Sequence, residues 1–111
     1  MKTASLLQNL NFNDQKPAVS VLLETDFTKE IRIAMQKGQA MMEHKTAFPI
    51  VVQVFSGRID FGVRGEKVVL EGGDMIAVEG GVPHDLLAVE ESVVRLTLSK
   101  RDKVERVEKL V

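Results

Sequence analysis

GQAMMEHKTAFPIVVQVFSG (residues 38–57) and GDMIAVEGGVPHDLLA (residues 73–88) are the two stretches of sequence that decide the fold of this chain. Each begins with glycine, alternates apolar with polar or small side chains and carries one histidine. These are the two histidines of the sequence, His44 and His84. Such alternation is typical of half-buried β-strands, in which successive side chains point to opposite faces of a sheet. Two segments of this kind predict a small barrel in which both imidazoles converge on one site.

Similar alternation recurs from residue 19 to residue 99. It predicts nine short strands, at residues 19–24, 30–35, 41–45, 49–55, 58–64, 66–70, 74–78, 83–89 and 93–99. Short strands with glycine-containing turns are typical of a sandwich or barrel and not of βαβ units. We therefore expect one all-β domain at 18–99, after a polar lead-in at 1–17. In the tail at 100–111, apolar residues at helical spacing allow either a short amphipathic helix or a frayed end.

The composition argues against several classes of function. Fifteen basic and sixteen acidic residues leave a net charge of −1, and there is no Trp or Tyr to stack on bases, so we expect no nucleic-acid partner. Cysteine is absent, which excludes disulfides and thiolate metal ligands and fits a reducing cytoplasm. The N-terminus is too polar for a signal peptide, and no stretch approaches the roughly 20 apolar residues of a membrane helix. We therefore expect a cytoplasmic protein with no membrane partner.

The spacing of glycine and histidine resembles that of the cupin family, whose two motifs are G-x5-H-x-H-x3-E-x6-G and G-x5-P-x-G-x2-H-x3-N. Six positions match in register: Gly38, His44, Gly57, Gly73, Gly81 and His84. The 15 residues between Gly57 and Gly73 equal the short gap between the motifs of small bacterial members. The resemblance covers residues 31–99 and implies a double-stranded β-helix, the jelly-roll cupin barrel, which in small members is commonly a homodimer.

Four motif positions depart from the family pattern. Thr46 replaces the second histidine, Ile50 the glutamate, Glu79 the proline and Ala88 the asparagine. The resemblance implies a site of three imidazoles and one carboxylate around a divalent metal, and of these ligands it carries over only His44 and His84. Two protein ligands make a weak site. We assign no cofactor and keep a weakly bound zinc, nickel, iron or manganese ion as an alternative.

Strand parity predicts which side chains accompany the histidines. If His44 faces inward, Met42 and Thr46 do so too, and Ile50 and Phe61 fall on the inward rows of the next strands. The expected ligand-contacting residues are therefore His44, His84, Thr46, Ile50, Met42 and Phe61. Apolar walls with two imidazoles are the usual composition of a small-molecule pocket.

We predict that the barrel binds a small, partly apolar molecule in its interior without catalysing a reaction. One alternative is a metal-dependent cupin enzyme of the dioxygenase or isomerase type, with a reduced site of histidines alone. Another is an assembly module whose barrel is filled by its own side chains. No catalytic residue is assigned, because the sequence offers neither a tyrosine acid nor a serine placed near either histidine.

Val51 and Phe55 fall on the outward face of their strand. Exposed β-branched and aromatic residues on a sheet face need a cover. We predict that a second copy of the chain provides it, so that the protein is a homodimer. The alternative is that the N-terminal segment of the same chain covers them.

Overall fold

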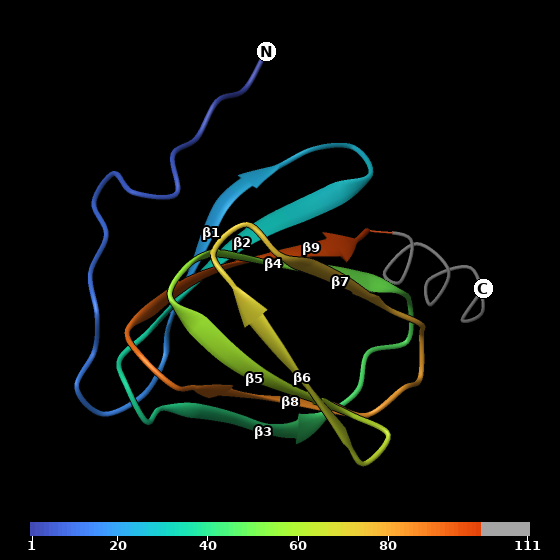
Figure 1. Ribbon diagram of the computed structural model, residues 1–111. Helices are drawn as coiled ribbons and strands as arrows, with labels where there is room; N and C mark the ends of the chain where they lie inside the picture. Colours follow the sequence, from blue (N-terminus) through green and yellow to red (C-terminus); the bar gives the residue numbers. More distant parts are fainter. Residues whose placement is uncertain (101–111) are drawn as a thin grey trace.

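The computed structural model describes residues 1–100, which form two facing β-sheets (Figure 1). The larger sheet has the order β1 (Ala18–Glu24), β2 (Thr28–Met35), β9 (Ser92–Ser99), β4 (Ile50–Ser56) and β7 (Met75–Val78). The smaller sheet has the order β3 (Ala40–His44), β8 (His84–Ala88), β5 (Arg58–Val63) and β6 (Glu66–Glu71). All nine predicted strands are present, with ends shifted by at most two residues, and the all-β prediction is confirmed.

The predicted tail beyond Lys100 lies outside the described residues. Among residues 1–100, no helix is long and apolar enough to cross a membrane.

An aliphatic core fills the space between the two sheets. The inward rows of β4 and β5 are buried as the alternation predicts: Ile50, Val52, Val54, Ile59 and Phe61 are all at most 4% exposed. Phe61 is the largest fully buried side chain. Because protein interiors are close-packed, side chains of this size leave little free space inside a barrel. The interior is therefore occupied by the chain's own residues.

Strand β3 departs from simple alternation. Met41 pairs with Leu86 and His44 pairs with His84, so three steps along β3 match two along β8. This β-bulge puts an extra residue into β3 and resets the parity of its side chains. The expectation that Met42 faces inward with His44 is therefore wrong. Met42 is 80% exposed, whereas Met41 packs against the core.

The polar lead-in is bound to the barrel by a buried arginine. The guanidinium of Arg32, on β2, donates hydrogen bonds to the backbone carbonyl oxygens of Leu6, Gln8 and Asn9, and Arg32 is only 5% exposed. A buried guanidinium needs such acceptors, because its donors would otherwise be desolvated without compensation. Figure 1 shows the segment running down one side of the barrel before it enters β1.

The chain passes from the larger to the smaller sheet at Gly57, between β4 and β5. Gly57 has a φ of +93°, and a Cβ there would meet the hydroxyl of Ser92, the carbonyl oxygen of Glu91 and, at 2.7 Å, the Cα of Ser92. The buried Ser92 hydroxyl is itself fixed, since it accepts a hydrogen bond from the Arg58 backbone nitrogen at 3.0 Å. Only glycine fits this corner, for reasons of both conformation and space.

We predict that Gly57→Ala lowers the free energy of unfolding by about 3 kcal/mol or more, because left-handed strain and a backbone clash add. Gly65→Ala is the matched control. Gly65 also has a positive φ, +77°, but a Cβ there meets open space, so its cost is about 1 kcal/mol. Urea unfolding of both variants measures the difference. Equal losses of unfolding free energy in the two variants would show that a clash of the Cβ added at position 57 with residues 91 and 92 adds no cost.

Candidate functional site

The structure brings His44 and His84 together at one end of the barrel. They are direct cross-strand partners on β3 and β8, with ring centroids 4.4 Å apart and ring planes at 62°. The ring of Phe61 stacks on that of His84, with centroids 5.7 Å apart and planes within 7° of parallel. Three residues from different strands of the smaller sheet, all predicted to contact ligand, thus form one cluster.

The two imidazoles differ in burial. His84 is 2% exposed and belongs to the packed interior, whereas His44 is exposed. The pair therefore spans the rim of the barrel, with one ring inside and one ring in contact with solvent. A molecule approaching from solvent meets His44 first.

Hydrogen bonds to the backbone fix the ring nitrogens. The Nδ1 atoms of His44 and His84 lie 2.8 Å and 3.0 Å from the carbonyl oxygens of Met42 and Val82. A carbonyl can only accept, so each Nδ1 carries the proton and donates, and Nε2 of the neutral ring is left as an acceptor. Every buried polar side-chain atom in residues 1–100 has a partner. Nε2 of His84 makes no such bond in residues 1–100, so this atom is not completely sealed from solvent, although the residue as a whole is only 2% exposed.

The remaining predicted site residues have structural roles. The Thr46 hydroxyl donates a hydrogen bond to the carbonyl oxygen of Phe48 at 2.8 Å. Ile50 is 4% exposed and packs in the hydrophobic core, facing inward as predicted. Met42 points to solvent, and only its carbonyl oxygen takes part in the cluster, through His44. The side chains at these three positions therefore do not add ligands to the histidine pair.

The residues present do not fit a four-ligand metal centre. Within the described part of the chain, no group of three or more His, Cys, Asp or Glu side chains could hold a metal ion. Glu79 lies at the surface, 85% exposed, 3.8 Å from Arg64. Asp85 packs over Gly62, whose missing side chain leaves room for the carboxylate. Among residues 1–100, no carboxylate therefore completes the site with the two imidazoles.

A hollow of about 170 Å³, with both apolar and charged side chains in its lining, opens near the histidine cluster. Val63 and Val82 line it, and both adjoin His84: Val63 is its cross-strand partner on β5, and Val82 supplies the carbonyl for its ring. Ile76 and Val78 of β7 also line it, together with the exposed Arg64 and Glu79. Sequence reasoning missed this hollow as part of the site. The sequence does contain an indication of this hollow, because the inward-facing row of β5 continues from Phe61 to Val63.

Two antiparallel sheets that close on a histidine pair define a small jelly-roll barrel. The family model described as "Cupin domain" matches residues 31–99, more than half of the chain, and the chain belongs to the cupin family. This confirms both the resemblance and the predicted fold.

Solved structures agree with this assignment. The chain is similar to an RmlC-like cupin protein from Desulfovibrio desulfuricans, with a TM-score of 0.82 and 22% identity over 89% of this chain and 96% of that chain. It is also similar to a conserved protein with a double-stranded β-helix domain from Klebsiella pneumoniae, with a TM-score of 0.81 and 20% identity over 88% and 84% of the two chains. KdgF from Halomonas sp. has a TM-score of 0.73 and 20% identity over 86% and 93%. At these identities the likeness shows the fold alone. A search of curated protein sequences gave no match.

We predict that His84→Ala lowers the free energy of unfolding by about 2–4 kcal/mol, because it leaves a cavity beside Phe61. His44→Ala, at the exposed member of the pair, should cost less than about 1 kcal/mol. Thermal and urea unfolding of the two variants give the comparison. A larger loss for His44→Ala would contradict the placement of the two rings.

Proposed function

We propose that this cupin binds a small, partly apolar molecule at the mouth of its barrel, with His44 and His84 as its polar contacts, and that it does not catalyse a reaction. The observation that supports this most directly is the pair of imidazoles at the end of the barrel, next to Val63 and Val82, which line a hollow there. Apolar walls with a few directed polar groups are the usual composition of a ligand site.

The chemistry of the histidine cluster indicates which class of ligand it can bind. Because Phe61 and its neighbours fill the interior, the ligand lies at the rim and not at the centre of the barrel. Because both Nδ1 atoms donate to carbonyl oxygens, the neutral rings offer acceptors, which suit a hydroxyl or amine on the ligand. The apolar part of the ligand packs against Val63 and Val82. A non-catalytic role is favoured because Glu79 and Asp85 lie away from the rings, which leaves the imidazoles without an oriented carboxylate partner.

A matched pair of probes tests the proposal. Cyclohexanol carries a hydroxyl donor, whereas methoxycyclohexane has a similar apolar ring without one. Both are titrated while the Cε1–H signals of the two histidines are followed by NMR. We expect cyclohexanol to shift both signals, with a Kd of about 1 mM or weaker as for other fragments, and the ether to shift them much less. His44→Ala should abolish the difference between the probes, and His84→Phe, which keeps a ring against Phe61, should do the same.

Several outcomes would overturn the proposal. One is that neither probe shifts either histidine signal, which would favour the assembly module with a filled barrel. Another is an unchanged response in His44→Ala. The third is stoichiometric, tight binding of Zn²⁺ or Ni²⁺ that both variants abolish, which would favour the metal-dependent alternative. Nδ1-bonded metal-site histidines commonly present Nε2 in this way, so the metal titration is the necessary comparison.

A further inference from the structure

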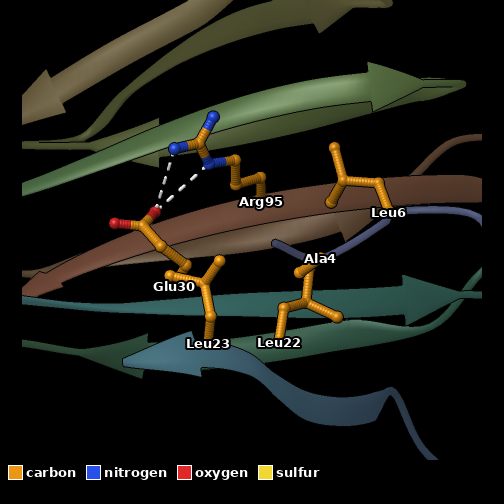
Figure 2. Close-up of a pocket in the computed structure, with 6 residues that line it drawn as sticks. All are labelled: Ala4, Leu6, Leu22, Leu23, Glu30 and Arg95. Atoms are coloured by element: carbon orange, nitrogen blue, oxygen red, sulfur yellow. Dashed lines mark hydrogen bonds and ion pairs between the residues drawn. The ribbon is translucent and has the colours of Figure 1, made fainter. Parts of the chain in front are cut away.

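Another hollow lies between the N-terminal segment and the five-stranded sheet (Figure 2). Its volume is about 260 Å³, and it is lined by Ala4, Leu6, Leu22, Leu23, Glu30 and Arg95. These residues come from the N-terminal segment and from β1, β2 and β9. We call it the N-terminal hollow. An enclosed cavity of about 150 Å³ is large enough for a benzene ring, so the N-terminal hollow has room for a small apolar group.

Two hydrogen bonds hold the N-terminal segment against the sheet, one on either side of Ala4 in the sequence. The Lys2 ammonium donates to the Glu24 backbone carbonyl oxygen at 2.7 Å. The buried guanidinium of Arg32 donates to the Leu6 carbonyl oxygen at 3.3 Å. The wall that the segment contributes is therefore held at both ends, and ligand sites are usually pre-formed in this way.

A β-bulge supplies two neighbouring leucines to the same hollow. Val21 pairs with Ile31 and Leu23 pairs with Glu30, so Leu22 is an extra residue in β1. In a regular strand, neighbouring side chains point to opposite faces. The bulge changes this, and both Leu22 and Leu23 line the hollow. Both are only half-buried, so the hollow offers apolar surface that an apolar ligand can cover.

An ion pair supplies the polar part of the lining. Figure 2 shows Arg95 pairing with Glu30; the Arg95 Nε and Nη2 atoms lie 3.2 Å and 3.1 Å from Oε1 of Glu30. The Thr97 hydroxyl donates to the same oxygen at 2.6 Å. Burial raises the pKa of the Glu30 carboxyl, but hydrogen bonds from Thr97, Thr28 and Arg95 outweigh burial and hold the pKa below its usual value. Glu30 is therefore an anion at neutral pH, and its Oε1 already accepts from three donor atoms.

The hydrogen-bonding capacity that remains belongs to Arg95. A guanidinium has five N–H donors, and in residues 1–100 only Nε and Nη2 of Arg95 bond to Glu30. Figure 2 shows the third nitrogen, Nη1, directed away from Glu30. The Arg95 side chain is 45% exposed, so a ligand can reach these donors from solvent. Guanidinium donors bind carboxylates through strong, charge-assisted hydrogen bonds, which favours an anionic acceptor over an amine.

We propose that the N-terminal hollow binds a small aliphatic carboxylate, with its anionic group on Arg95 and its hydrocarbon tail against Leu6, Leu22 and Leu23. Lys2 adds a positive charge at the start of the segment, which offsets the charge of Glu30. The site is separate from the histidine cluster, because the two share no residue. A ligand here contacts both the N-terminal segment and the sheet, and so stabilises the attachment of the segment.

Hexanoate and 1-hexanol are matched probes, because they have six-carbon chains and only hexanoate carries a carboxylate. Each is titrated into the full chain while NMR follows the methyl signals of Leu6, Leu22 and Leu23. The Cε1–H signals of the two histidines report on the mouth of the barrel in the same samples. We expect hexanoate to shift the leucine signals with a Kd of about 1 mM and to leave the histidine signals unchanged. 1-Hexanol should bind at least about 10-fold more weakly.

Variants test the two halves of the site. Leu6→Ala should raise the Kd for hexanoate about 5-fold by removing contact with the tail. Leu7→Ala is the matched control, because Leu7 is 55% exposed and is not part of the lining, and it should change nothing. Arg95→Gln should raise the Kd at least about 10-fold. Because Arg95→Gln leaves Glu30 without its cation, the double variant Glu30→Gln/Arg95→Gln, checked by circular dichroism, should show the same loss.

Four results would overturn the proposal. The first is no response of the leucine methyl signals to hexanoate, and the second is an equal response to 1-hexanol. The third is equal weakening by Leu6→Ala and Leu7→Ala, because the tail would then not lie in this hollow. The fourth is unchanged hexanoate binding in a folded Glu30→Gln/Arg95→Gln variant. Binding that is weakened by Leu6→Ala and Arg95→Gln but not by Leu7→Ala or His44→Ala supports the proposal, whatever the outcome at the histidine cluster.

Discussion

The packing of Phe61 between the two sheets determines where this barrel can present polar chemistry. Its ring is fully buried and stacks on His84, so the centre of the barrel is filled by hydrocarbon at the density of a protein interior. A polar group placed deeper would be desolvated without a partner. His84 reduces this cost because its Nδ1 donates a hydrogen bond to the Val82 carbonyl oxygen. The next position towards solvent belongs to His44, and the polar site is therefore confined to the rim.

Much of this arrangement could be predicted from the sequence, because a sheet with one buried face alternates with a period of two. That rule places Ile50, Phe61 and His84 correctly on the inner face. It fails at Met42, because the β-bulge in β3 adds a residue that period-two counting cannot register. Glycine often marks a bulge, but the bulged stretch between Met41 and His44 contains none. The convergence of the histidines was therefore predictable, while the orientation of their neighbour on β3 was not.

The binding of the N-terminal segment shows a different limit of sequence reasoning. Arg32 sits in an alternating strand where a charged residue predicts a solvent-exposed position, yet it is buried. Its acceptors are the backbone carbonyls of residues that precede it by 23 to 26 positions. Every residue has a backbone carbonyl oxygen, so the side chains of those residues do not indicate that their backbone will accept hydrogen bonds from a guanidinium. The outer face of the sheet is therefore covered on β2, whereas Val51, Phe55 and Met75 on β4 and β7 are 40%, 40% and 60% exposed.

Strand β7 contributes to the proposed binding region at the end of the barrel. It has four residues and lies at the edge of its sheet, with β4 as its one neighbour in the strand order. Its inward residues Ile76 and Val78 line the same hollow as Val63 and Val82, and its outward residue Met75 is 60% exposed. A short edge strand with a single ladder is held largely by what packs on its two faces. A ligand at the mouth of the barrel would add packing to the inner face of β7 and so hold this strand more firmly against β4.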